Sequence, residues 1–461
     1  MALPFKKACK ALLDTIELWR ESGCPPHNSI NYNIACLSVP VEACDVLSWL
    51  RAQTVHPQIF WSQRGQDEMF AGLGEAWSIR MEGSDATYRD TIQQLQSLLE
   101  KATPETHFWG GFRFDADASV GKPWHQWPAA SFILPRIVLN RRKEGCRLMG
   151  FIPRFSKADE RTGLDTLRTT LLELSEPSAS TSFPTPTYCD RSDSFKKQQW
   201  STAVASALEA IHDQRLHKVV LARAVDFTLK TKTTALQMLQ VLQPIVPQAF
   251  HFCFQMDPKN GFFGATPECL YHRRGHEISG EALAGTTARG CTDREDTALG
   301  KTLQNNDKEQ REHLSVLSYL ETALQPLCTH IERNSLMECM KMPGIQHLRS
   351  CVQGSLRPGI GDADILCALH PTPAVAGVPP DPARFFIKQM EPFDRGWYTG
   401  PVGFVSRAET QFAVALRCGL MVEDVLRIYA GAGIVAGSEA LREWQETELK
   451  LGTWNELLKP L

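Results

Sequence analysis

Two pairs of glutamates carry the clearest potential for chemistry in this sequence. Glu309 and Glu312 stand three residues apart in one predicted helix, and Glu443 and Glu446 repeat that spacing near the end of the chain. Side chains three positions apart share one face of a helix, so each helix presents a small acidic surface. Mg²⁺ prefers oxygen ligands and keeps several waters, so it needs only one or two carboxylates directly. The spacing therefore indicates either a magnesium site between two helices or two ordinary solvated helix faces.

Two further features could hold an anionic ligand. Arg417 follows an alternation over 412–416 that predicts a strand paired with 425–430, with Arg417 on the face opposite the large apolar side chains. A guanidinium can bind a carboxylate through two parallel hydrogen bonds. Gly431 and Gly433 have no side chain to keep a ligand away from their backbone N–H groups. The alternative interpretations are a structural ion pair for Arg417 and a tight turn for the glycines.

The elements that position these residues can be predicted from periodicity. Apolar residues at helical spacing predict helices at about 88–101, 200–211, 296–324 and 438–451, the last capped by Ser438. Apolar runs predict strands that include residues 59–61, 148–152 and 218–223. Hairpin strands with a few long helices, rather than regular β-α-β alternation, favour an α+β fold with large antiparallel sheets.

One shift in composition divides the chain. Residues 175–194 are rich in Ser, Thr and Pro, which predicts an exposed loop. The loop separates residues 1–190, where no chemical constellation is found and a scaffold is predicted, from residues 197–455, which hold all the candidate residues.

The bulk properties exclude several classes of function. The chain has 461 residues, is 22% charged and carries a formal net charge of −3, so it lacks the basic stripe that a nucleic-acid partner requires. The first 23 residues carry charges every few positions, which predicts an amphipathic helix in a cytoplasmic protein without a membrane segment. The 14 cysteines are scattered without a C-x-x-C pair and are predicted to be buried, reduced thiols. A small-molecule partner is the remaining expectation.

Eight segments in consistent order match the motifs of one enzyme family. They are residues 218–223, 264–268, 280–286, 308–313, 346–348, 370–377, 396–403 and 429–450. With them the region from about 197 to 450 resembles the chorismate-utilising enzymes, which include isochorismate, salicylate, anthranilate and aminodeoxychorismate synthases. Residues 57–64 and 108–112 add a looser likeness to isochorismate synthases of the menaquinone pathway. The resemblance implies one α+β unit with two large, mostly antiparallel sheets and surrounding helices.

The resemblance also implies roles for individual residues. Glu312 and Glu446 would bind Mg²⁺ directly, with Glu309 and Glu443 assisting directly or through water. Lys218 would be the general base and Glu268 the general acid. Without the family context, Lys218 reads as a strand-end lysine whose amine reaches solvent, and Glu268 as a turn residue. The residues implied in binding the substrate, chorismate, are Arg417, Tyr398, Gly431, Gly433, Lys450, Thr286, His347 and Ala374.

The chemistry selects among the members of the family. Converting chorismate to isochorismate adds water at C2 and removes the hydroxyl at C4, which requires one neutral base and one protonated acid, and burial favours both forms. Lys218 favours water over ammonia as the nucleophile, so no glutamine amidotransferase subunit is expected. Ala284 disfavours the aminodeoxychorismate branch, and Ala374 stands where pyruvate-releasing members tend to have threonine. We therefore predict an isomerase, an isochorismate synthase without lyase activity, that serves menaquinone or siderophore and salicylate synthesis.

Three alternatives stay open at this point. One is a salicylate synthase, which forms isochorismate and then eliminates pyruvate. Another is a catalytically silent homologue that only binds chorismate. The third is a magnesium enzyme that acts on diphosphates, although the sequence has no Asp-rich motif or phosphate-binding glycine loop.

Overall fold

A computed structural model describes residues 2–26, 29–83, 87–117, 121–177, 185–342 and 344–460. The helices are α1 Phe5–Ser22, α2 Val46–Arg51, α3 Tyr88–Glu100, α4 Lys157–Glu173, α5 Lys197–His212, α6 Ala235–Ile245, α7 Asp293–Gln304, α8 Asp307–Leu324, α9 Asp362–Leu369, α10 Pro380–Met390 and α11 Ala440–Leu457. The strands of the first half are β1 Ile34–Val41, β2 Gln58–Ser62, β3 Met69–Met81, β4 His107–Phe112, β5 Ala130–Arg142, β6 Gly145–Pro153, β7 Thr187–Asp193 and β8 Lys218–Leu229. Those of the second half are β9 Phe250–Asp257, β10 Asn260–Thr266, β11 Cys269–Arg274, β12 Glu277–Ala288, β13 Cys328–Met342, β14 Ile345–Leu356, β15 Gly377–Val378, β16 Pro401–Ser406, β17 Glu409–Val414, β18 Cys418–Val422, β19 Val425–Ile434 and β20 Lys459–Pro460.

The described strands form one hydrogen-bonded sheet. Its main path runs β13-β14-β12-β11-β17-β16-β4-β5-β3-β2-β9-β10-β18-β19-β8-β7-β20, with β6 joined to β5, β1 joined to β6 and β15 joined to β8. Every pairing between these strands is antiparallel except that of β7 with β20. The α+β class with a large antiparallel sheet is thereby confirmed. A second large sheet is not shown in the described part of the chain, because the pairing continues without interruption from β13 to β20.

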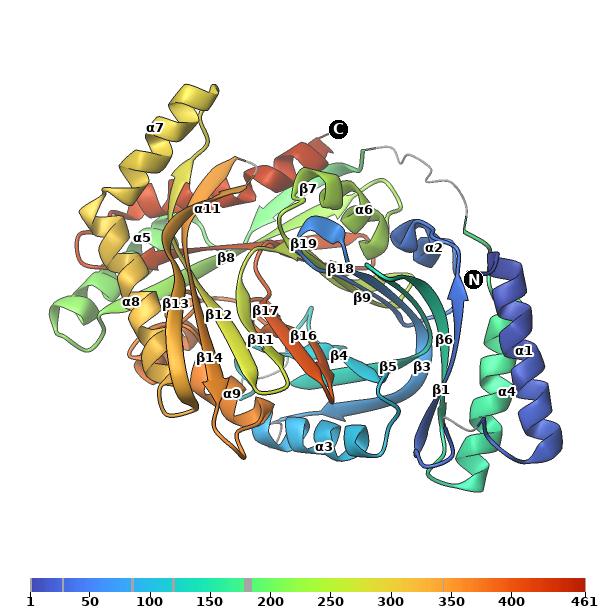
Figure 1. Ribbon diagram of the computed structural model, residues 1–461. Helices are drawn as coiled ribbons and strands as arrows, with labels where there is room; N and C mark the ends of the chain where they lie inside the picture. The colour runs from blue at the N-terminus through green and yellow to red at the C-terminus, as the bar shows by residue number, and fades with distance from the viewer. Residues whose placement is uncertain are drawn as a thin grey trace.

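Helices cover the outside of the curved sheet. Figure 1 shows the strands curling around the middle of the molecule, with α1 and α4 side by side at one end and α7 and α8 at the other. Helix α3 illustrates why such helices form: the Thr87 side chain accepts a hydrogen bond from the Asp90 N–H at 3.1 Å, and Ile92, Leu95 and Leu99 bury one stripe. None of the described helices is long and apolar enough to cross a membrane.

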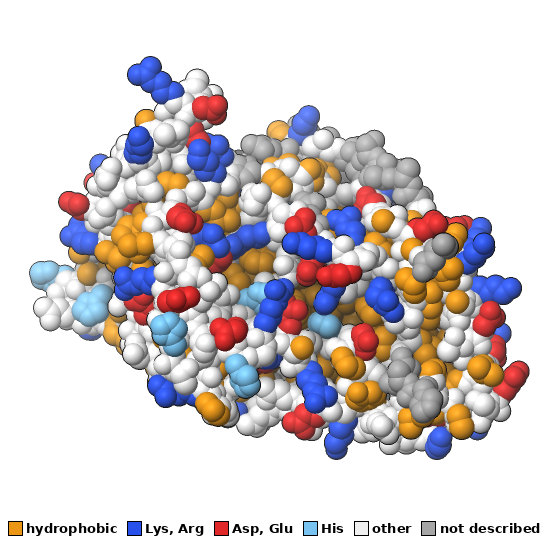
Figure 2. All heavy atoms as spheres, viewed as in Figure 1, with side chains coloured by type: hydrophobic (Ala, Val, Ile, Leu, Met, Phe, Trp, Pro, Cys, Tyr) orange, Lys and Arg blue, Asp and Glu red, His pale blue; other side chains and the backbone are white. Residues whose placement is uncertain are grey.

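Strands from the two halves of the chain pair with each other. Strand β2 pairs with β9, and β4 pairs with β16, so that Trp109 lies opposite Phe404. The rings of Trp61, Trp109 and Phe404 are in mutual contact, with 4.6 Å between the centroids of the last two. On the face seen in Figure 2, basic and acidic side chains are interspersed over both halves. The fourteen cysteines are free thiols, but only six of them are buried, so the predicted burial is wrong for the other eight.

The predicted long helix over 296–324 is wrong in one respect, because it is two helices. Helix α7 ends at Gln304 and α8 begins at Asp307. The Asn306 side chain accepts hydrogen bonds from the N–H groups of Lys308 at 3.0 Å and Glu309 at 3.1 Å. An asparagine that satisfies free N–H groups in this way starts a new helix rather than continuing an old one.

The predicted pairing of the strand around residue 412 with 425–430 is also wrong. Strand β17 pairs with β11 and β16, whereas β19 pairs with β18 and β8. Arg417 lies after β17 with a φ of 44°, in the turn that leads into β18. In the sheet, all the strands from β16 to β18 along the main path lie between β17 and β19, the two strands that alternation alone would have paired.

Two local predictions need correction. Residues 187–193 of the predicted loop form strand β7 beside β8, residues 178–184 lie outside the described part of the chain, and the rest of the segment is irregular. Helix α11 begins after Glu439 without a side-chain cap. Ser438 instead accepts a hydrogen bond from the Val435 N–H at 3.2 Å, so its hydroxyl stabilises the preceding turn.

Candidate active site

One cavity brings together the residues singled out in the sequence. It lies between β8, the β10–β11 turn, β12, α8, β14, β19 and α11, and has an open volume of about 1100 Å³. All of the predicted site residues except Glu443 line it, namely Lys218, Glu268, Thr286, Glu309, Glu312, His347, Ala374, Tyr398, Arg417, Gly431, Gly433, Glu446 and Lys450.

The predicted base sits at the start of a buried strand. Lys218 is 4% exposed, and its Nζ lies 2.9 Å from Oε1 of Glu312 on α8. Gly433 on β19 leaves space for this pair, because a Cβ there would lie 3.1 Å from Cε of Lys218 and 3.3 Å from Oε1 of Glu312. The amino group of Lys218 and the carboxyl group of Glu312 thus meet inside the cavity across 94 positions of sequence.

The predicted acid is held in the turn between β10 and β11. Glu268 is 1% exposed. Burial raises the pKa of Glu268 to about 8, and the neighbouring Glu281 adds to the effect, while Lys218 and Arg64 oppose it. At neutral pH this carboxyl group is protonated and can donate a proton.

The four predicted metal ligands influence one another electrostatically. Burial raises the pKa of Glu309, and repulsion from Glu312 and Glu446 adds to it. Burial likewise raises the pKa of Glu443, which lies behind the cavity wall with Lys308 Nζ 3.9 Å from its Oε1. For Glu312, burial is outweighed by Lys218, so its pKa is lowered.

The carboxylates are not gathered into a compact metal cluster. Among the described residues, no group of three or more His, Cys, Asp or Glu side chains is close enough to hold a metal ion. Lysine side chains donate hydrogen bonds to some of the carboxylate oxygens instead. Lys450 Nζ lies 2.7 Å from Oε1 of Glu446 and 2.8 Å from the Gly431 carbonyl oxygen.

A buried guanidinium faces the cavity. Burial lowers the pKa of Arg417 to about 10, and the Nη1 atom has no hydrogen-bond partner among the described residues. Its Nη2 lies 3.5 Å from Nε2 of His347, whose pKa burial lowers to about 3, so that this ring is neutral. Nδ1 of His347 lies 3.1 Å from Thr286 Oγ1. A buried donor without a partner is costly, so the site is suited to an anionic ligand that pairs with Arg417.

Tyr429 is a cavity residue that the sequence prediction missed. Its ring stacks on that of Tyr398 with 4.7 Å between centroids and 11° between planes, and both rings line the cavity. A signal for it was present, because Tyr429, Gly431 and Gly433 alternate along β19 and therefore share one face of the strand.

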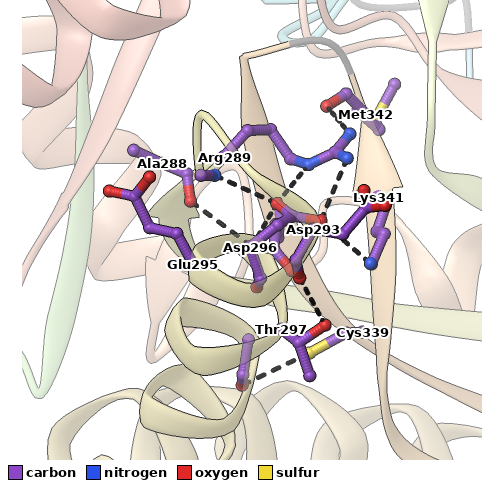
Figure 3. A network of polar contacts seen from close by, with 12 residues as sticks. Ala288, Arg289, Asp293, Glu295, Asp296, Thr297, Cys339, Lys341 and Met342 are labelled. Carbon is purple, nitrogen blue, oxygen red and sulfur yellow. Dashed lines mark hydrogen bonds and ion pairs between the residues drawn. The ribbon is translucent and has the colours of Figure 1, made fainter.

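Two charge networks lie beside the cavity walls, the first buried and the second partly exposed. Arg395 donates to the carbonyl oxygens of Val375 and Val220, both at 2.8 Å, and ion-pairs with Glu391. In the second network, just after the end of β12, Asp296 accepts hydrogen bonds from Arg289 at 2.6 and 3.0 Å and pairs with Lys341 at 2.9 Å (Figure 3). These basic partners lower the pKa of Asp296 well below its usual range. This second network fixes the end of β12 to α7 and to the β13–β14 hairpin.

Comparison with known proteins places the chain among enzymes of one family. The sequence profile of the chorismate binding enzymes matches residues 22–459. The chain is 32% identical to the isochorismate synthase MenF of Escherichia coli over 91% of both chains. It is 33% identical to the salicylate biosynthesis isochorismate synthase of Pseudomonas aeruginosa, over 90% of this chain and 87% of that one. The solved structure of the menaquinone-specific isochorismate synthase MenF from Escherichia coli superposes with a TM-score of 0.84 at 30% identity, covering 97% of this chain and 99% of that one. The chain therefore belongs to the family of chorismate binding enzymes and is an isochorismate synthase-like member of it.

Proposed function

We propose that this protein isomerises chorismate to isochorismate in a magnesium-dependent reaction. The observation that carries the proposal is the pairing, in one cavity, of a buried lysine with a buried glutamic acid that is protonated at neutral pH. These are the two proton-transfer groups that adding water at C2 and removing the hydroxyl at C4 require.

Lys218 and Glu268 divide the proton transfers between them. Lys218 takes a proton from water as the water oxygen bonds to C2. The ring double bond shifts, the C4–O bond breaks, and Glu268 gives its proton to the departing hydroxyl, which leaves as water. One water enters and one leaves, so the product is an isomer of the substrate. A pKa of about 8 keeps Glu268 in the donating form at neutral pH.

The carboxylates suit a magnesium ion. Glu312 and Glu446 would bind the ion directly, with Glu309 and Glu443 assisting directly or through water. The raised pKa values of Glu309 and Glu443 reflect burial and repulsion between neighbouring carboxylates, which a divalent cation would relieve. Mg²⁺ draws much of its shell from water and substrate, so it would need only one or two of these carboxylates as direct ligands. The bound ion would neutralise the ring carboxylate of chorismate.

The remaining charges of the cavity favour a dianion. With Glu268 protonated and Lys218 neutral as the base, three basic groups, Lys308, Arg417 and Lys450, face three carboxylates, Glu309, Glu312 and Glu446. Adding Mg²⁺ makes the site positive, which matches the two carboxylates of chorismate. Arg417 and Tyr398 would bind the enolpyruvyl carboxylate, and Thr286 and His347 line the wall beside Arg417.

Backbone N–H groups of β19 are available for the ring carboxylate. Pairing with β18 ends at Ile428, so the following residues pair on one side only, with β8. The Gly431 carbonyl oxygen accepts from Lys450 rather than from a strand. Because the N–H and C=O of one strand residue point the same way, the N–H groups of Gly431 and Gly433 face the same open edge.

The product is expected to keep its pyruvyl group. Ala374 lines the cavity where pyruvate-releasing members tend to have threonine, so no hydroxyl is offered at that point. The similarity to the menaquinone-specific enzyme, at a TM-score of 0.84, favours menaquinone synthesis as the destination of the product.

The experiment is to incubate the purified protein with chorismate and Mg²⁺ and to separate the products by chromatography. Isochorismate alone is the expected product, and its formation should stop when EDTA is added and resume with excess Mg²⁺. Release of salicylate and pyruvate would move the protein to the lyase branch. Binding without turnover would identify a silent homologue. Lys218→Ala should abolish turnover and leave chorismate binding intact.

A further inference from the structure

An ion-pair cluster from three separate segments surrounds the turn that carries Glu268. Glu281 on β12 pairs with Arg64 and with Arg349 on β14. Arg64 lies in the short helix η2 (Arg64–Gln66) directly after β2, 217 positions away from Glu281. Its Nη1 donates to Oε1 of Glu281 at 2.8 Å, and the Nε of Arg349 donates to the same oxygen at 3.1 Å. The Arg64–Glu281–Arg349 cluster is thus a compact, largely buried unit.

The cluster contacts the backbone on both sides of Glu268. On one side, Nη2 of Arg64 donates to the carbonyl oxygen of Pro267. On the other side, Oε2 of Glu281 lies 3.5 Å from the N–H of Cys269. The carbonyl of Glu268 itself accepts from the Val414 N–H at 3.1 Å. The peptide groups before and after the acid are therefore held by one ion pair.

Packing restrains the cluster further. The Arg64 guanidinium lies over the ring of Phe250, with its Cζ 4.7 Å from the centroid. The side chains of Arg64 and Glu281 are 18% and 10% exposed. Burial opposes ionisation of Glu281, but Arg64 and Arg349 outweigh it and lower its pKa, so it stays ionised beside Glu268. A surface ion pair between the same residue types would be loosely held and solvated. The Arg64–Glu281 pair is instead restrained by its neighbours and largely shielded from water.

We propose that Arg64 and Glu281 are positioning residues that fix the general acid Glu268 toward the substrate. The inference rests on the proposed function, because it takes Glu268 as the acid. It assigns a direct part in the active site to residues 1–190, which sequence patterns present only as scaffold. Misplacing a catalytic group by about 1 Å can cost roughly a hundredfold in rate, so a turn held at both ends has catalytic value.

The charges in the cluster give the proposal a specific signature. The groups that act on Glu268 are Glu281 from β12, Lys218 from β8 and Arg64 from η2. Removing the negative charge of Glu281 should lower the pKa of Glu268, and removing the positive charge of Arg64 should raise it. The two variants should therefore shift the alkaline limb of kcat/KM in opposite directions, which a general loss of structure would not do.

The test compares Arg64→Met, Arg64→Lys and Glu281→Gln with the wild-type enzyme, using chorismate and Mg²⁺ over a range of pH. Methionine keeps an unbranched apolar side chain beside Phe250 while removing the charge and the donors. Arg64→Met and Glu281→Gln should lower kcat at least about tenfold with KM within about twofold. Arg64→Lys should return the alkaline limb to the wild-type position and only partly restore kcat, because one ammonium cannot replace the bidentate contact. The matched control is Arg80→Met, which breaks the exposed Arg80–Glu75 pair elsewhere in the same half and should leave kcat unchanged.

The outcomes separate this proposal from the proposed function. If Arg64→Met and Glu281→Gln keep kcat within about twofold of wild type, or lose it without opposite shifts of the limb, the positioning role is wrong. If the wild-type enzyme makes no isochorismate, the proposed function fails instead. In that case the cluster is tested by urea unfolding alone, which measures how Glu268→Gln changes the free energy of unfolding at each pH. The pH range of that change should move down when Glu281→Gln is also present and up when Arg64→Met is also present. If the range does not move in either double variant, the inference is wrong.

Discussion

Replacing Glu268 by glutamine should change how stability depends on pH, and the size of the change follows from its burial. Folding raises the pKa of Glu268 from 4.5 to about 8. A group whose pKa is raised by folding contributes stability that is complete below pH 4.5 and is lost as the pH rises through 8. At about 1.4 kcal/mol for each pKa unit, the full loss is about 5 kcal/mol.

The effect is best measured above the pH range in which the histidines with lowered pKa values titrate. The buried histidines His107, His251, His347 and His370 have lowered pKa values and stay neutral above pH 6.5. Between about pH 6.5 and pH 8 the free energy of unfolding of the wild-type protein should fall by roughly 1.5 to 2 kcal/mol more than that of Glu268→Gln.

Urea unfolding at several pH values in this range gives the free energy of unfolding of each protein. Glu144→Gln, at an exposed position between β5 and β6, is the control and should show no such difference. If the difference between wild type and Glu268→Gln is the same at every pH, Glu268 is ionised in the folded protein. It could then not serve as the general acid at neutral pH.

Two further predictions concern a glycine of the site and a buried ion pair. In Gly433→Ala the new Cβ would lie 3.1 Å from Cε of Lys218, so kcat should fall about tenfold or more with little change in melting temperature. The control is Gly452→Ala inside α11, where the new Cβ meets no atom within 4 Å. Its free energy of unfolding should rise by about 1 kcal/mol and its kcat should be normal. Equal kcat values for the two variants would refute the steric argument. Asp362→Asn leaves Arg273 without its bidentate partner, at 2.7 and 2.8 Å, and should cost about 3 to 5 kcal/mol in urea unfolding. Glu423→Gln, which breaks the exposed pair with Lys259, should cost less than about 1 kcal/mol, and similar losses for both would contradict the role of burial.

Local spacing in the sequence indicated only part of the cavity lining. The i, i+3 pattern placed Glu309 and Glu312 on one face of α8, where both line the cavity. The resemblance to the chorismate-utilising enzymes implied the residues that spacing alone did not single out, among them Lys218, Glu268 and Tyr398, which also line it. Alternation along β19 would also have found Tyr429. Helix α3 and strands β2, β6 and β8 were predictable for the same reason.

Long-range pairing was not predictable from spacing. Alternation indicates that residues 412–416 include a strand, but it does not say which strand lies beside it, and β18 intervenes. Arg417 consequently sits in a turn with positive φ rather than on a sheet face. The break between α7 and α8 depended on whether Asn306 would cap or continue a helix, which its contacts decide.

What local periodicity determined by itself was which side chains of one element share a face, such as the two glutamates of each pair, and the motif resemblance added the other candidate groups. Only the tertiary structure decided which charges meet. Lys218 reaches Glu312 across 94 positions, and Arg64 reaches Glu281 across 217. These encounters set the protonation states, since burial and charged neighbours determine a pKa, and both arise only when distant segments pack together.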